Sequence, residues 1–233
     1  MSKILKGARV EKQVVDDTDL ALINAQSLVP RTAENVFTFR LAACDNQVDR
    51  DKERFTDRTL DQFSEMFVGR PVLRDHNWNG GSQTARIYAG HVESNGSVRR
   101  LILQAYMPRN ERAAPVIDDI EAGILREVSV GVSVRNALCS ICGEPYGDCP
   151  HLRGQIYEDE QCCVELDDAE DAYELSFVAV PAQRDAGVVK RYEAKEQKLD
   201  SVNPTGAAGD HDDPALLQAQ AMQELEEKRF GGM

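Results

Sequence analysis

Four residues with metal-binding side chains lie in one short segment of the 233-residue sequence. Cys139, Cys142, Cys149 and His151 have the spacing C-x2-C-x6-C-x-H. Zinc prefers four sulfur or nitrogen ligands arranged as a tetrahedron, and a C-x2-C turn supplies two of them. Gly143 follows the second cysteine, where such a turn often requires a positive φ. Four protein ligands leave no open coordination position, so we expect a structural Zn²⁺ site at residues 139–151.

The sequence also contains residues suited to nucleophilic hydrolysis, which requires a hydroxyl, an imidazole within reach and a group that fixes the imidazole tautomer. Of the four histidines, His151 belongs to the cysteine cluster and His211 lies in a segment of linker composition. His76 follows apolar residues 72–73 in a polar turn, where a base can be both held and exposed. His91 alternates within a strand pattern, which is typical of a residue on the sheet surface.

Ser129 is the candidate nucleophile. It lies in the segment REVSVGVSVRN (126–136), in which valines on one face alternate with Ser129, Gly131 and Ser133 on the other. Gly131 would allow a peptide backbone to approach closely, and neighbouring backbone N–H groups could bind an oxyanion. The residues by themselves leave open both a hydrolase site and purely structural roles for His76 and Ser129.

Alternating strand patterns and short helical patterns predict an α+β domain. Strands are expected at 34–46, 72–73, 85–93, 98–107, 126–136, 161–166 and 173–180. One helix is expected to begin at Thr56 or Asp57 and to present Leu60, Phe63 and Phe67. A second is expected to begin at Asn110, to carry Ile124 on its apolar face and to end near Gly123.

Composition divides the chain into three parts. Residues 1–33 are mixed and polar and are expected to form an extended or loosely docked arm. Residues 34–192 should form the domain, with residues 139–154 as a cysteine-rich insertion. Residues 193–233 have the composition of a flexible linker followed by a helix or tail.

The charge and the apolar content restrict the partners. The formal net charge is −13, so we expect no nucleic-acid partner, because phosphates would be repelled. Residues 158–171 hold eight carboxylates and are expected to form a solvated loop and strand edge. No run approaches the ~20 apolar residues of a membrane span, and the first residues, MSKILKGARVEKQ, have no apolar stretch long enough for a signal peptide, so no targeting segment is expected. A cytosolic fold is therefore expected, in which cysteines bind metal or stay as thiols.

Three segments together, in order, resemble the prohead protease family of tailed phages, whose fold is similar to that of the herpesvirus assembly protease. They are GRPVLRDHNW (69–78), AGILREVSVGV (122–132) and YELSFVAVPA (173–182), and the resemblance covers residues 36–185. It implies that His76 is the base, Ser129 the nucleophile and Glu174 the third member of a triad. Because the herpesvirus relatives use a second histidine as third member, His91 remains the alternative to Glu174.

The resemblance also implies a fold and a biological role. The expected core is mostly antiparallel and barrel-like, with flanking helices. The expected activity is that of a serine endopeptidase that cleaves scaffold, major capsid protein and itself inside the procapsid, in the host cell cytoplasm. A homodimer is compatible with the resemblance, and neither nucleic acid nor membrane is expected as a partner. Two alternatives are an inactive capsid-assembly or scaffold protein with a structural zinc site, and a zinc-bearing binding module.

Overall fold

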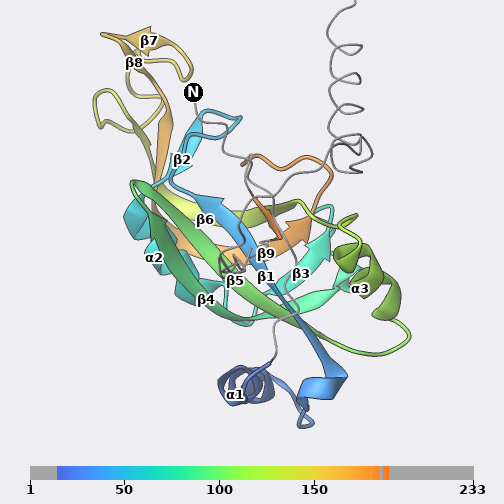
Figure 1. Cartoon of the computed structure of the whole chain (residues 1–233). Helices are drawn as coiled ribbons and strands as arrows, with labels where there is room; N and C mark the ends of the chain where they lie inside the picture. Colours follow the sequence, from blue (N-terminus) through green and yellow to red (C-terminus); the bar gives the residue numbers. More distant parts are fainter. Residues whose placement is uncertain (1–14, 184–185, 189–233) are drawn as a thin grey trace, which may run out of the picture. The chain divides into compact units, whose positions relative to one another are not determined.

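An eight-stranded, mostly antiparallel sheet forms the body of the protein (Figure 1). The structure is a computed structural model that describes residues 15–183 and 186–188. The expected arm residues 1–14 and the linker and tail 193–233 lie outside the described residues. The strands of the sheet are β1 (Val36–Asp45), β2 (Glu53–Phe55), β3 (Pro71–Arg74), β4 (Ala85–Asn95), β5 (Val98–Pro108), β6 (Val128–Cys139), β9 (Val164–Phe177) and β10 (Gly187–Val188).

The strand order is β10-β1-β5-β4-β3-β9-β2, and β6 pairs with the other edge of β9. β9 is parallel to β2 and β3 and antiparallel to β6. The α+β class is confirmed, but the barrel expected from the resemblance does not close. In the described part of the chain, β6 and β10 share no ladder, and an isolated bridge pairs Glu127, the residue before β6, with Gly187 of β10.

Three α-helices lie within the described residues: α1 (Asp17–Gln26), α2 (Asp57–Met66) and α3 (Ala114–Glu121). Short 3₁₀ turns occur at η1 (Ala33–Asn35) and η2 (Gly80–Ser82). None of these described helices has the length and apolar character needed to cross a membrane. Thr56, one of the two predicted caps, begins α2 by accepting a hydrogen bond from the Thr59 N–H, and Leu60 and Phe63 are fully buried in the core.

The extent of α3 differs from the prediction. Asn110 caps only the turn before the helix, where its Oδ1 accepts a hydrogen bond from the Ala113 N–H at 2.9 Å. The helix begins at Ala114 and ends at Glu121, and Gly123 then turns the chain with a φ of +75°. Ile124, expected on the apolar face, therefore lies beyond the helix and is 70% exposed.

Part of the expected N-terminal arm is a docked helix. Asp16 caps α1 by accepting a hydrogen bond from the Asp19 N–H, in a reciprocal capping box. Ile23 is fully buried in a small cluster with Tyr88 of β4. The Tyr88 hydroxyl donates to Asp19 at 3.1 Å, and burial together with this carboxylate raises the pKa of Tyr88. The prediction of a loosely docked arm is therefore wrong for residues 17–26.

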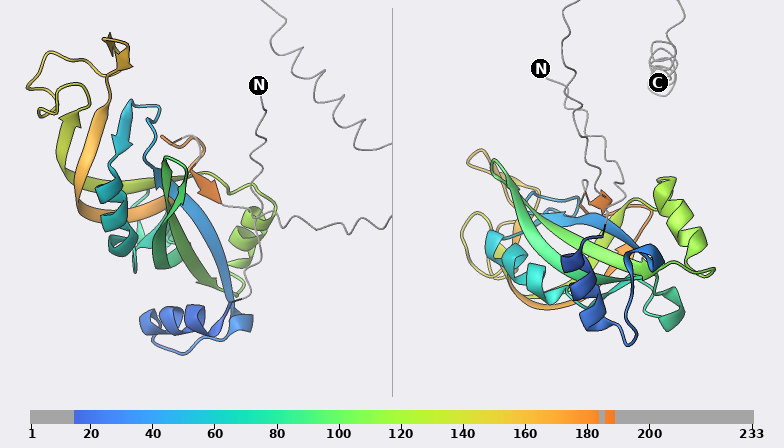
Figure 2. Two further views of the ribbon diagram at one scale, coloured as in Figure 1. Left: turned by 60° about the vertical axis from the view of Figure 1, so that its left-hand side comes forward. Right: turned by 60° about the horizontal axis from the view of Figure 1, so that its bottom comes forward.

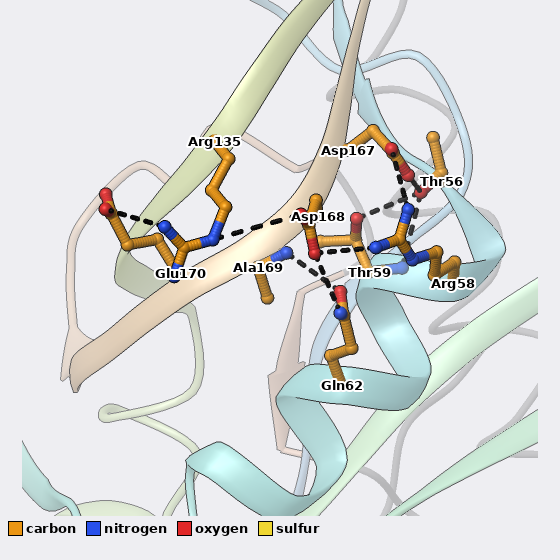
Figure 3. Close-up of polar contacts among 9 residues, drawn as sticks. All are labelled: Thr56, Arg58, Thr59, Gln62, Arg135, Asp167, Asp168, Ala169 and Glu170. Atoms are coloured by element: carbon orange, nitrogen blue, oxygen red, sulfur yellow. Dashed lines mark hydrogen bonds and ion pairs between the residues drawn. The ribbon is translucent and has the colours of Figure 1, made fainter.

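The two strands expected at 161–166 and 173–180 form one strand, β9, which runs from Val164 to Phe177. Of the acidic run expected to form a solvated loop and strand edge, residues 158–161 are exposed as predicted, whereas residues 164–171 lie within β9, where their carboxylates have arginine partners. Arg58 of α2 donates to Asp168 at 2.8 Å, and Arg135 of β6 donates to Glu170 at 3.4 Å (Figure 3). Repulsion among neighbouring carboxylates is thereby offset by arginines that are distant in sequence.

The β6–β9 pair extends beyond the rest of the sheet and carries the two-stranded β7 (Ile156–Tyr157) and β8 (Glu160–Gln161) at its far end (Figures 1 and 2). The predicted insertion 139–154 lies in this projecting part. Arg153 reaches back to Glu53 of β2 with a contact of 2.5 Å. The projecting part has few buried apolar side chains of its own, so its order requires another source of stability.

Gly90 of β4 permits α2 to approach the sheet. A Cβ at this position would lie 2.4 Å from the backbone oxygen of Ser64. We expect Gly90→Ala to destabilise the protein by about 1–3 kcal/mol, because the backbone of α2 must shift. Gly80→Ala is the matched control, since its Cβ would meet nothing within 4 Å. Urea unfolding of both variants checks this, and equal stabilities would contradict it.

Candidate functional site

His76 is held in a strained turn that follows β3. The Asn77 N–H donates to the Arg74 carbonyl at 3.0 Å, and the two central residues, Asp75 and His76, have φ values of 54° and 51°. Left-handed backbone is uncommon for residues other than glycine, although Asp and His tolerate it better than most. The Asp75 N–H donates to the Phe177 carbonyl at 2.9 Å, so β9 holds the turn.

Glu174 is the partner of the His76 imidazole. Its Oε1 lies 2.7 Å from His76 Nδ1, and its side chain is 2% exposed. Its Oε2 accepts a hydrogen bond from the Ser176 hydroxyl at 2.5 Å. A carboxylate at Nδ1 favours the tautomer that carries its proton on Nδ1, which leaves Nε2 as the basic nitrogen. His76 itself is 41% exposed at the side chain, so the buried acid orients a solvent-accessible imidazole.

Gly131 of β6 makes room for that carboxylate. It pairs with Glu174 across the β6–β9 ladder, and a Cβ at Gly131 would lie 2.2 Å from Glu174 Oε1. The sequence argument assigned Gly131 to close approach of a substrate backbone. The structure instead places the Glu174 carboxylate against it.

Ser129 lies on the same face of β6 as this carboxylate. Gly131 presents its α-carbon to Glu174, and Ser129, two residues earlier, shares that face. Ser129 also pairs directly with Ser176, so its half-buried side chain stands beside the Glu174–Ser176 hydrogen bond. Ser129 and His76 do not hydrogen bond to each other in this structure. The three predicted triad residues are thus gathered on one face, with the acid–imidazole contact formed and the imidazole–hydroxyl contact open.

His91, the alternative third member, has a different partner. It lies on β4, and its Nε2 is 3.1 Å from Glu93 on the same strand. Burial of Glu93 opposes its ionisation, but hydrogen bonds from His91 and Arg40 outweigh this effect and lower the pKa of Glu93. Glu174, and not His91, contacts His76.

A cavity of about 300 Å³ lies on the valine face of β6, with Ser129 at its border, and the side chains of His76 and Glu174 do not line it. Its apolar wall comes largely from β6, and three acidic residues of the segment around β2 lie at its border. Burial raises the pKa of two of these acids, Asp49 and Glu53. The cavity is lined by Ala43, Asp49, Asp51, Glu53, Phe55, Val128, Ser129, Val130, Val132, Val134, Leu166, Ala182, Gln183 and Ala186.

Sequence reasoning missed an aromatic pair near His76. The rings of Trp78 and Tyr173 lie 5.5 Å apart and are 69% and 37% exposed. The Tyr173 hydroxyl is 3.1 Å from the Ser133 hydroxyl. Tyr173 occupies a bulge in β9, opposite the Gly131–Val132 step, and no local sequence signal marks that bulge. Ser176 was missed too, although its position two residues after Glu174 puts both on one face of a strand.

The four predicted metal-ligating residues come together at the projecting end of the sheet. The candidate ligand atoms of Cys139, Cys142, Cys149 and His151 all lie within 4.8 Å of one another, so this cluster could bind a metal ion. His151 Nδ1 is buried and has no hydrogen-bond partner among the described residues, as expected for a nitrogen reserved for a metal. Gly143 has a φ of +75°, which confirms the predicted knuckle turn.

The thiols of this cluster differ in their tendency to ionise. Burial raises the pKa of Cys139, but the backbone N–H groups of Cys142 and Ile141 and the neighbouring thiols outweigh it and lower the pKa to about 6. Burial and a hydrogen bond to Cys139 raise the pKa of Cys162 to about 11. The Cys162 sulfur lies 3.8 Å from the Cys139 sulfur. Cys162 thus ionises less readily than Cys139.

Comparisons of this chain with family models, with curated proteins and with solved structures find no match. The geometry of the site and the three sequence segments therefore carry the functional argument.

The contact between Gly131 and Glu174 can be tested by mutation. We expect Gly131→Ala to lower the free energy of unfolding by about 1–3 kcal/mol, because the added methyl group occupies the space of Glu174 Oε1. The same substitution made in a Glu174→Ala background should cost much less. Urea unfolding of the four proteins measures both effects. If Gly131→Ala lowered the free energy of unfolding equally in the two backgrounds, the added methyl group would not be in contact with Glu174.

Proposed function

We propose that the protein is a serine endopeptidase of the prohead protease type, with Ser129 as nucleophile, His76 as general base and Glu174 as the residue that orients the base. The observation that carries the proposal is the 2.7 Å contact between His76 Nδ1 and the buried Glu174 carboxylate. A buried acid against an exposed imidazole supplies two of the three groups that nucleophilic hydrolysis requires, and Ser129 on the strand next to β9 is the candidate for the third.

In this mechanism Ser129 Oγ attacks the carbonyl carbon of a peptide bond while His76 Nε2 accepts the hydroxyl proton. The same nitrogen then returns the proton to the leaving amine, and a water molecule releases the acyl group by the reverse sequence. Glu174 remains ionised and stabilises the imidazolium. Backbone N–H groups near Ser129 would bind the oxyanion. Because Ser129 and His76 do not hydrogen bond in this structure, substrate binding must bring Oγ and Nε2 into contact, as often happens in hydrolases.

The resemblance of the three sequence segments supports the choice of substrates, which are scaffold, the major capsid protein and the protease itself. Cleavage would take place inside the procapsid in the host cell cytoplasm. The open sheet is compatible with a herpesvirus protease-like core that is less closed than a full barrel.

A catalytically inactive capsid-assembly or scaffold protein is the second candidate. It is favoured by the missing hydrogen bond between Ser129 and His76. It would keep the buried Glu174 as a structural residue and would require no reaction at Ser129.

The decisive experiment compares the full-length chain with its Ser129→Ala variant, each incubated with the major capsid protein of its virus. We expect discrete shortened products by intact mass spectrometry with the parent chain and none with Ser129→Ala, because general base catalysis alone contributes roughly 10²–10⁴ in rate. Ser133→Ala is the matched control, since Ser133 lies on the same face of β6 and should leave cleavage unchanged. Identical masses with all three folded proteins would favour the inactive assembly protein.

For the cysteine cluster we propose Zn²⁺ as the ion and stabilisation as its role. Three thiolates and one imidazole match the ligands that structural zinc prefers, and they fill its four positions. The projecting end of the sheet has little core of its own, so metal binding would supply its folding energy.

We expect the chain to be isolated with an equimolar amount of zinc and Cys142→Ser to lose most of it. Without the metal, amide hydrogens of residues 139–163 should exchange faster, whereas those of β1, β4 and β5 should stay protected. Elemental analysis and hydrogen-exchange mass spectrometry measure both effects. Cys44→Ala serves as the control because Cys44 lies outside the cluster. Unchanged exchange after complete zinc removal would exclude the stabilising role.

A further inference from the structure

Ser176 is a buried hydroxyl at the centre of the candidate active site, and it has no part in the chemistry described above. It is 0% exposed. On β9 it pairs with Ser129 of β6 on one side and with Leu73 of β3 on the other. It therefore stands between the strand that carries the nucleophile and the strand that leads to His76.

The Ser176 hydroxyl makes two hydrogen bonds, one with Glu174 and one with His76. It donates to Glu174 Oε2 at 2.5 Å and accepts from the backbone N–H of His76 at 3.1 Å. A hydroxyl has one proton and two acceptor sites, so both bonds form together. The bond to the carboxylate is of the charge-assisted kind, which is shorter and stronger than a bond between neutral groups.

These two hydrogen bonds fix the two groups that position the His76 imidazole, its own backbone and the Glu174 carboxylate. One holds the backbone of His76 in its left-handed conformation, and the other orients the carboxylate that contacts Nδ1. If the hydroxyl is removed, the His76 N–H and Glu174 Oε2 lose their shared partner at a position closed to solvent. The turn and the carboxylate can then adopt other orientations, and the imidazole loses its alignment.

We infer that Ser176 is a positioning residue, which acts on the reaction through Glu174 and the backbone of His76. Its effect on catalysis rests on the proposed function, whereas its effect on the geometry of His76 does not. Ser176 is not a second nucleophile, because its proton is committed to Glu174 and its side chain is closed to solvent.

The first test is a double-mutant cycle read by the rate at which Ser129 reacts with a fluorophosphonate probe, which requires no known substrate. We expect Ser176→Ala to slow labelling about tenfold or more in the parent chain. In a Glu174→Gln background the same substitution should change the rate by less than about twofold, since the residue through which Ser176 acts is already altered. Equal effects in the two backgrounds, or no effect in the parent chain, would overturn the inference.

The second test reads the geometry without any catalysis. A proton shared between His76 Nδ1 and a carboxylate gives a far-downfield proton NMR signal, which should be present in the parent chain and in Ser129→Ala. We expect Ser176→Ala to shift or abolish it, and Thr59→Val, which removes another fully buried hydroxyl, to leave it unchanged. An unaltered signal in Ser176→Ala overturns the inference.

The two tests separate the inference from the proposed function. If no protein is labelled by the probe but the NMR signal depends on Ser176, the protease proposal fails and the positioning role stands. Should Ser176→Ala not fold, Ser176→Cys replaces it in both tests. The thiol is a weaker donor of nearly the same size, so the labelling rate should be intermediate and the NMR signal shifted. A Ser176→Cys protein identical to the parent chain in both readouts would overturn the inference.

Discussion

Burial of the Glu174 carboxylate is the constraint on which the rest of the site depends. A carboxyl group that is 2% exposed is costly to bury unless each oxygen has a partner. One oxygen contacts the His76 imidazole, and the other accepts the Ser176 hydroxyl bond. Gly131 must lack a side chain for the first oxygen to fit. Three features therefore serve the same requirement, that the buried carboxyl group be hydrogen-bonded and have room: the left-handed turn at His76, Ser176 on β9 and Gly131 on β6. Ser129 lies beside them because it shares the face of Gly131.

The same strand that supplies the acid also organises the sheet. β9 pairs with β2, β3 and β6, so it joins the strand that carries Ser129 to the strand that precedes the His76 turn. Its acidic residues between 165 and 171 would repel one another in an isolated strand. Arginines from α2 and β6, with Arg54 and Arg70, supply the opposite charge. These ion pairs offset the repulsion along a strand that runs, with two bulges, from the projecting end to the candidate site.

The projecting end has a different source of order. Beyond the sheet, residues 139–163 have few apolar side chains to bury, and hydrogen bonds between short strands such as β7 and β8 are marginal in water. Four candidate ligand atoms within 4.8 Å of one another provide a local alternative to a core. Hydrogen bonds from the backbone N–H groups of Cys142 and Ile141 and from neighbouring thiols lower the pKa of Cys139, in keeping with a metal-ligating role. The cysteine cluster and the candidate site thus consist of separate residues, joined by the β6–β9 pair.

Local sequence patterns were sufficient to predict several strands, one helix and the metal cluster of this protein. Alternation marked β1, β4, β5 and β6, the Thr56 cap marked α2, and cysteine spacing marked the metal cluster, because each depends on residues close in sequence. Motif resemblance marked His76, Ser129 and Glu174. Only the tertiary structure decided between Glu174 and His91 as the partner of His76, since that contact joins residues 98 apart. It also decided that β9 is one strand, because the arginine that binds Asp168 lies 110 residues away. Pairing register and charge partners are set by the assembled sheet, and no short window of sequence contains them.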